Sequence, residues 1–117
     1  MPYTQVITKT EHEPQEVLVY GPLNQVRERF KAVFKVVSPK EHDDLNERVI
    51  NGDDIGMLVE EVTVKLLDFG IPEDVPDAEA ITNTVQNSEF ANAIWGSFQS
   101  LMARNFDQTR HKSKKRK

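Results

Sequence analysis

Apolar side chains recur at helical spacing over most of the second half of the chain. Over residues 53–69 they follow one another at steps of three and four, which predicts one amphipathic helix that two aspartates open and Gly70 ends. The same spacing predicts a shorter helix over about residues 77–86. A last helix is predicted over 89–106, where apolar and aromatic residues cover a broad arc and the Asn-Ser pair before it can cap its first turn.

The clearest boundary signal is the sequence Ser-Pro-Lys-Glu at residues 38–41. It places a serine N-cap, a proline at the first helical position and a glutamate at the third, which together form a capping box. Leu45 and Val49 then share one face, and the Asn-Gly pair at 51–52 supplies a stop signal. We therefore expect a helix over about residues 38–50.

The first third of the chain is dominated by strand signals. Residues 16–20 form a run of strand-forming residues that a Gly-Pro pair stops, whereas the first fifteen residues indicate only a short strand or an extended arm. Residues 23–37 fit both a helical and a strand period. We favour a strand from about Phe30 to Val37 that pairs with 16–20, and a helix remains the alternative.

These elements predict an α+β fold that is mainly α. A short N-terminal β-hairpin or extended arm is followed by three to four helices. A chain of 117 residues suits one domain. We assign residues 1–107 to it, with an extended part over 1–37 and a helical part over 38–107, and expect residues 108–117 to be a basic disordered tail.

Charge divides the chain into two unlike parts. The net charge is −4, with 19 acidic and 15 basic residues, but the last eight residues hold six bases and no acid. Residues 1–109 are left with nine bases against nineteen acids, a net charge of −10. Such a body repels nucleic acid, so any contact with phosphates would have to come from the tail. The basic residues of the tail are Arg110, Lys112, Lys114, Lys115, Arg116 and Lys117.

The composition of the chain excludes several other classes of protein. There is no cysteine, which excludes a disulfide scaffold, a thiolate metal site and a cysteine nucleophile, and which suits a reducing cytosol. No apolar run approaches the roughly 18 residues of a membrane span, and the N-terminus lacks a signal-peptide pattern. We expect no contact with a membrane.

Candidate catalytic motifs are weak. The His-Asp-Asp sequence at 42–44 resembles part of a metal phosphohydrolase site, but only His12 and His111 remain as further histidines. The acidic pairs at 53–54 and 60–61 do not converge, because adjacent helical residues point about 100° apart. The Asp-Phe-Gly triplet at 68–70 lacks every other kinase motif. We therefore expect no catalytic residue, no metal and no cofactor, and we do not expect an enzyme.

The aromatic C-terminal helix is the most suggestive feature. Its residues can all belong to the core, which is the interpretation we favour, or some can remain exposed and bind a partner or a second copy. The candidate partner-binding residues are Phe90, Ile94, Trp95, Phe98, Leu101, Met102 and Phe106.

The order of these segments resembles the small tail assembly chaperones of long-tailed (siphovirus) bacteriophages. The matching stretch runs from Phe30 to Phe106: an aromatic strand, the capped start at 38–43, an apolar segment over 59–69 and a helix over 78–85. The most specific part is the apolar-aromatic segment over 90–98, followed by Ala-Arg-Asn-Phe at 103–106 and a basic end.

The resemblance implies a non-enzymatic role in the cytoplasm of the bacterial host. Such chaperones coat the long, aggregation-prone tape measure protein and leave when tail tube protein polymerises around it. This role requires an apolar groove for the partner, an acidic exterior and self-association. Two alternatives stay open: a small structural virion protein, for tail completion or head–tail joining, and a nucleic-acid-associated regulator that uses the basic tail.

Overall fold

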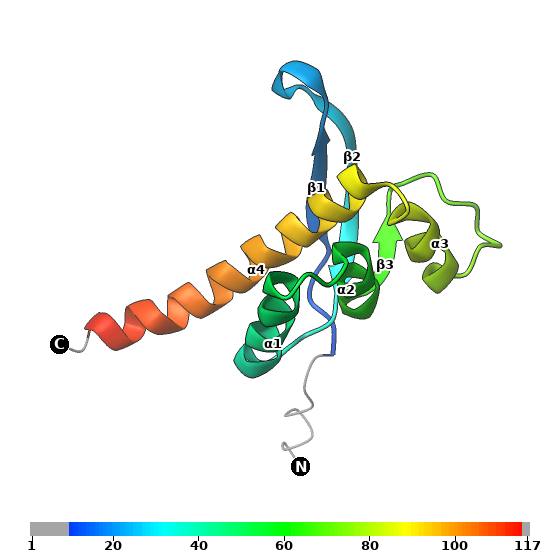
Figure 1. Cartoon of the computed structure of the whole chain (residues 1–117). Helices are drawn as coiled ribbons and strands as arrows, with labels where there is room; N and C mark the ends of the chain where they lie inside the picture. The colour runs from blue at the N-terminus through cyan, green and yellow to red at the C-terminus, as the bar shows by residue number, and fades with distance from the viewer. Residues whose placement is uncertain (1–9, 116–117) are drawn as a thin grey trace, which may run out of the picture.

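The computed structural model describes the backbone of residues 10–115 and the side chains of residues 10–105. A three-stranded sheet is combined with four α-helices and one short 3-10 helix (Figure 1). In chain order the elements are β1 (Gln15–Tyr20), η2 (Pro22–Asn24), β2 (Val26–Phe34), α1 (Pro39–Ile50), α2 (Ile55–Val62), β3 (Thr63–Leu67), α3 (Asp77–Thr84) and α4 (Ser88–Lys115).

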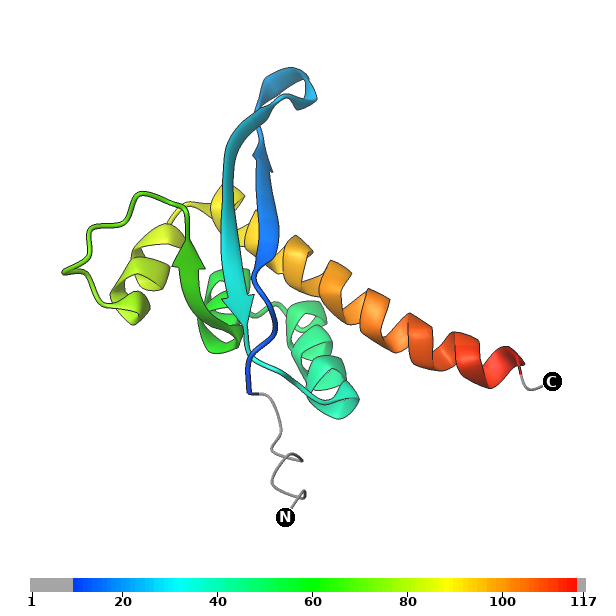
Figure 2. The same ribbon diagram turned by 180° about the vertical axis from the view of Figure 1, so that it is seen from behind.

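The sheet is antiparallel, with strand order β1-β2-β3. Val17 pairs with Phe30, and Ala32 pairs with Leu66, so these residues share the face of the sheet that packs against the helices. Figure 2 shows the opposite face, where no helix lies in front of β1 and β2. The helices therefore cover one side of β1 and β2 only.

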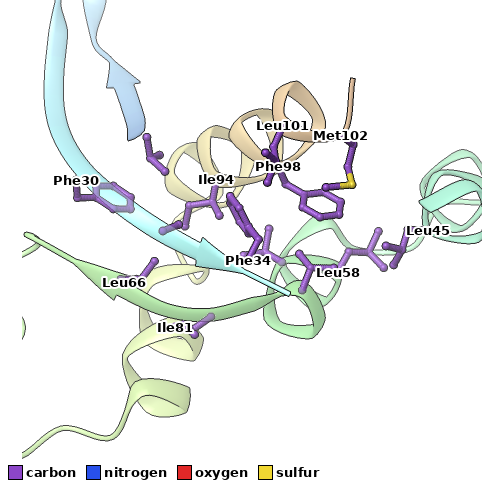
Figure 3. Close-up of a cluster of buried hydrophobic side chains, with 14 of the residues drawn as sticks. Phe30, Phe34, Leu45, Leu58, Leu66, Ile81, Ile94, Phe98, Leu101 and Met102 are labelled. Carbon is purple, nitrogen blue, oxygen red and sulfur yellow. The ribbon is translucent and has the colours of Figure 1, made fainter. Parts of the chain in front are cut away.

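One hydrophobic cluster holds the layers together (Figure 3). Phe30 and Phe34 enter it from β2, Leu58 from α2, and Phe98 from α4, all with at most 1% of their surface exposed. The Phe34 and Phe98 rings meet edge to face, with their centroids 5.4 Å apart. The long helix α4 is thus fixed to the sheet through its first half.

The predicted architecture of a hairpin followed only by helices is wrong. The sheet has a third strand, β3, which follows α2 directly and pairs with β2. The sequence predicts one helix over residues 53–69, but the helix ends at Val62. The reason is a run of three β-branched residues, Val62, Thr63 and Val64, which suits a strand better than a helix once β2 offers an unpaired edge.

The predicted strand over 16–20 and its pairing are confirmed, and the helical alternative for residues 23–37 is wrong. The second strand occupies 26–34 rather than 30–37. Beyond Phe34 the pairing is irregular: the Lys35 N–H donates to the Val62 carbonyl oxygen, and the Val36 N–H donates to the Thr10 carbonyl oxygen. Residues 1–9, where the arm was expected to begin, lie outside the described residues.

The capping box at the start of α1 is confirmed. The Glu41 N–H donates to Ser38 Oγ at 3.1 Å, and the Ser38 N–H donates to Glu41 Oε1 at 2.8 Å. Gly52 follows the helix with φ of +97°, a backbone conformation that favours glycine. The predicted stop at this glycine is therefore confirmed too.

The last two helices lie close to their predicted places. The expected helix over 77–86 corresponds to α3, and Asn87 caps α4 by accepting from the Glu89 N–H at 2.8 Å. The α4 backbone continues to Lys115, well past the predicted end at 106. It is thus helical through most of residues 108–117, where the sequence predicts a disordered tail.

Candidate protein-binding surface

Most of the predicted partner-binding residues on α4 are core residues. Ile94 and Phe98 have no exposed surface, Leu101 is 6% exposed and Met102 is 1% exposed. Their interpretation as an exposed surface is wrong for these four, because the sheet and α2 cover this side of the helix. Phe90 and Trp95 are half-buried against the same cluster, and the Phe106 side chain lies outside the described residues.

The basic end of the chain continues the line of α4. In Figure 1 the second half of this helix leaves the body of the molecule and projects past the edge of the sheet. The backbone of residues 110–115 is helical, whereas Arg116 and Lys117 lie outside the described residues. The four bases from Arg110 to Lys115 are therefore carried at a distance from the acidic body.

A projecting hairpin tip is the first candidate surface. Figure 1 shows the β1–β2 hairpin extending beyond the rest of the fold, and its turn carries three exposed apolar side chains. Tyr20 is 52% exposed, Leu23 is 89% exposed and Val26 is 43% exposed. The seven residues 20–26 contain no charged side chain, although 29% of the chain is charged. We call residues 20–26 the hairpin tip.

The backbone holds this tip in an unfavourable conformation. Leu23 has φ of +63° and ψ of 22°, and Asn24 has φ of +59°, both in the left-handed region. The turn is closed by a hydrogen bond of 2.8 Å from the Gly21 N–H to the Gln25 carbonyl oxygen. A left-handed leucine costs about 1–2 kcal/mol. The positive φ and the exposure of Leu23 make the hairpin tip a candidate binding surface.

A groove beside the hairpin is the second candidate surface. It has a volume of about 590 Å³ and lies between β1 and the outer side of α4. At one point the two walls meet, where Ser97 Oγ donates to the Glu16 carbonyl oxygen at 3.0 Å. Tyr20 belongs both to the groove and to the hairpin tip, so the two surfaces are continuous. The lining residues are Glu16, Leu18, Val19, Tyr20, Glu89, Asn92, Ala93, Gly96, Ser97 and Ser100.

The charges around this groove are already paired. Arg29 Nη1 lies 2.8 Å from Glu16 Oε2, and Arg27 Nη2 lies 2.8 Å from Glu89 Oε1. Arg27 also lies over the Phe90 ring, with its guanidinium carbon 5.9 Å from the centroid. Exposed pairs of this kind add little stability, but they leave the groove electrically neutral.

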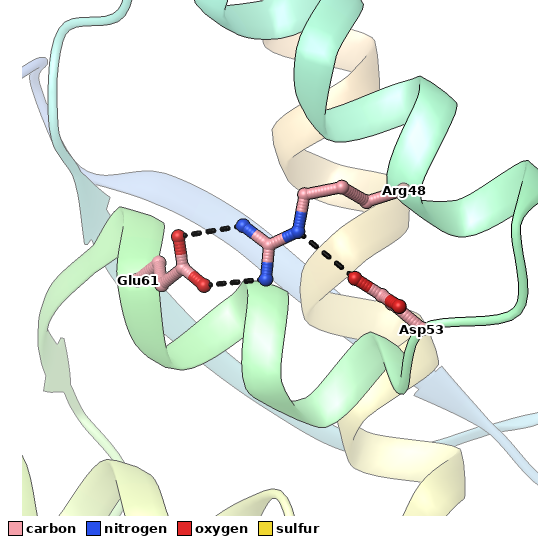
Figure 4. A network of polar contacts seen from close by, with 3 residues as sticks. All are labelled: Arg48, Asp53 and Glu61. Atoms are coloured by element: carbon pink, nitrogen blue, oxygen red, sulfur yellow. Dashed lines mark hydrogen bonds and ion pairs between the residues drawn. The ribbon is translucent and has the colours of Figure 1, made fainter.

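The largest ionic network lies elsewhere and joins α1 to α2 (Figure 4). Arg48 binds Glu61 through two hydrogen bonds of 2.9 and 2.8 Å and binds Asp53 through Nε at 3.0 Å. The hydrogen bonds from Arg48 lower the pKa of Glu61, and those to Glu61 and Asp53 raise the pKa of Arg48. The network fixes the corner between the two helices and offers no free group for chemistry.

The weak catalytic motifs do not assemble into a site. His42 Nε2 lies 2.7 Å from Gln99 Oε1, and Gln99 Nε2 donates to Asn46 Oδ1 at 2.6 Å, so this histidine joins α1 to α4. Glu60 accepts from Thr82 Oγ1 at 3.0 Å. Within residues 10–105, no group of three or more histidines or acids is placed to hold a metal ion.

The Asp-Phe-Gly triplet at residues 68–70 serves the fold. The sequence predicts it at the end of a helix, but it forms the turn after β3, where Asp68 has φ of +58° and Gly70 has φ of +70°. Phe69 turns back and stacks on Phe30, with 4.2 Å between the ring centroids. The triplet therefore closes one end of the core.

Sequence reasoning missed both candidate surfaces. The signal for the hairpin tip was available, as an uncharged run around Gly-Pro in a highly charged chain. No such signal exists for the groove, because its walls come from β1 and α4, which are about 70 residues apart in the sequence.

Comparison with known proteins adds no assignment: no family model, curated protein or solved structure matches the chain. None of the helices within residues 10–115 is long and apolar enough to cross a membrane.

Proposed function

We propose that this chain is a non-enzymatic protein-binding subunit that contacts its partner through the hairpin tip. The observation that carries the proposal is the exposure of Tyr20, Leu23 and Val26 on a projecting, uncharged turn. Exposed apolar side chains that gather at one projecting place favour contact with an apolar partner. The left-handed leucine at the centre of the turn supports the same role.

We further propose that the partner is a phage tape measure protein and that the chain is a tail assembly chaperone acting in the host cytoplasm. This finer proposal is supported by the resemblance of residues 30–106 to that family. It is also supported by the net charge of −10 over residues 1–109, which would keep a complex with an aggregation-prone partner in solution. Tail tube protein, which displaces such chaperones, is the second expected partner.

The test is co-expression of the chain with the tape measure protein of the same genome, followed by size-exclusion chromatography. We expect a soluble complex with the native chain and loss of the partner from the soluble fraction with Leu23→Asp. Ile50→Asp is the matched control, because Ile50 is 82% exposed at the end of α1, away from the hairpin tip. This variant should keep the partner soluble.

Three results would contradict the proposal. An insoluble tape measure protein beside a freely soluble chain would overturn the chaperone function. Presence of the chain in purified virions would instead assign it a structural role in the particle, since an assembly chaperone is absent there. Equal loss of solubility with both variants would show that the hairpin tip is not the binding surface.

A further inference from the structure

We propose that the groove between β1 and α4 is occupied by a second copy of this chain, so that two sheets join through their β1 strands across a twofold axis. This self-association is independent of the tape measure protein, because it uses the groove and the overhanging half of α4 rather than the Leu23 side chain.

The first observation is the unpaired edge of the sheet. β1 is an outer strand, so every second residue directs its backbone N–H and carbonyl away from β2. The Glu16 carbonyl faces Ser97 on the outer side, and the backbone groups of Leu18, two residues further on, face that same side. Among the described residues, no other strand pairs with this edge. An extended chain can pair with such a row of groups as a further strand of the sheet.

A second copy suits the groove in charge and in register. With the twofold axis at Leu18, each Glu16 faces the partner's Tyr20, so no two carboxylates meet. The wall formed by α4 includes four small residues, Ala93, Gly96, Ser97 and Ser100, and a Cβ added at Gly96 would touch nothing within 4 Å. The two α4 helices can therefore pack closely side by side.

The overhanging half of α4 supplies the second, independent observation. In both ribbon views this half passes beyond the β1 edge, to the side where the partner's sheet would lie (Figures 1 and 2). An isolated helical extension is marginal in water, whereas a helix that lies on another chain is stabilised. Residues 110–115 at its end include four bases, and residues 1–109 of each copy have a net charge of −10. The charges of the two copies are thus complementary.

A single introduced thiol tests the proposed axis directly, because the chain has no cysteine. Residues opposite each other in antiparallel strands have Cα atoms about 4.5–5.5 Å apart, which is within the range of a disulfide. We expect Leu18→Cys to form a covalent dimer rapidly when oxidised with diamide. Leu67→Cys is the matched control, since Leu67 is also half-buried in an edge strand but lies in β3.

The oligomeric state of the native chain is measured alongside, by size-exclusion chromatography with light scattering. We expect a mass of twice 13.4 kDa. We expect Gly96→Arg to raise the dissociation constant about tenfold or more, because the arginine occupies the space of the partner helix. Ala78→Arg, at an exposed position of α3, should have no effect.

A monomer at every concentration, or disulfide formation no faster at position 18 than at position 67, would overturn the dimer. Failure of this proposal is distinguishable from failure of the proposed function. Gly96→Arg should weaken the dimer about tenfold or more and keep its circular dichroism spectrum, whereas Leu23→Asp should remain dimeric while losing the tape measure protein.

Discussion

At the scale of single residues, Phe98 has the clearest role. It was a candidate for partner binding, yet it has no exposed surface and its ring contacts Phe34, Trp95 and His42. Any helix with apolar residues on a broad arc allows both interpretations, because the sequence does not say how much of the arc the sheet covers. The structure assigns Phe98 to the core.

We therefore predict that Phe98→Ala lowers the free energy of unfolding by about 3–5 kcal/mol, through lost burial and the cavity left behind. Urea denaturation monitored by Trp95 fluorescence measures the change. Leu23→Ala is the control, and it should leave the stability nearly unchanged because Leu23 is 89% exposed. A near-native stability of Phe98→Ala would return this residue to the binding surface.

The ion pair between Arg48 and Glu61 should make the stability of the fold depend on pH. Arg48 lowers the pKa of Glu61 in the folded state, so the pair stabilises the fold above the ordinary glutamate pKa and loses this effect as the pH falls through the lowered value. Glu61→Gln should thus reduce stability at pH 7, and the difference from the native chain should shrink in acid. Urea titrations at several pH values test this. Glu47→Gln, outside the Arg48 network, should give no such convergence.

At the scale of elements, the local start and stop signals were reliable. The capping box of α1 and its stop at Gly52 could be recognised from a few adjacent residues, because each rests on hydrogen bonds within one turn of helix. The end of α2 could not, because β3 exists only through its pairing with β2, some 30 residues earlier in the chain. Val59, Val62 and Leu66 belong to the apolar positions of the predicted helix over 53–69, and all three are buried, although they lie in two elements rather than one.

Removal of the Ser38 cap of α1 should destabilise the fold. Ser38→Ala removes the acceptor for the Glu41 N–H, and we expect it to lower the free energy of unfolding by about 1 kcal/mol. Ser38→Asp, which restores an acceptor, should recover most of the loss. Equal losses for the two variants in thermal or urea unfolding would show that the cap does not stabilise α1.

At the scale of the whole molecule, the acidic and the basic residues lie in different parts of the fold. The acidic helices surround one side of the sheet, whereas the basic residues at the end of the chain lie on the helix that leaves it. The hairpin projects from the same sheet, and the groove lies between the hairpin and the projecting helix. A single sheet therefore places a partner surface and a self-association surface next to each other.

The sequence by itself determined the elements whose causes are local: the capped helix α1, the strand β1, the helices α3 and α4, and the separation of an acidic body from a basic end. Only the tertiary structure decided that residues 63–67 form a strand, which face of α4 is buried, and that β1 and α4 enclose a groove. The physical reason is the range of the forces involved. Caps and periodicity act within a few residues, whereas strand pairing and burial depend on segments that meet only after folding.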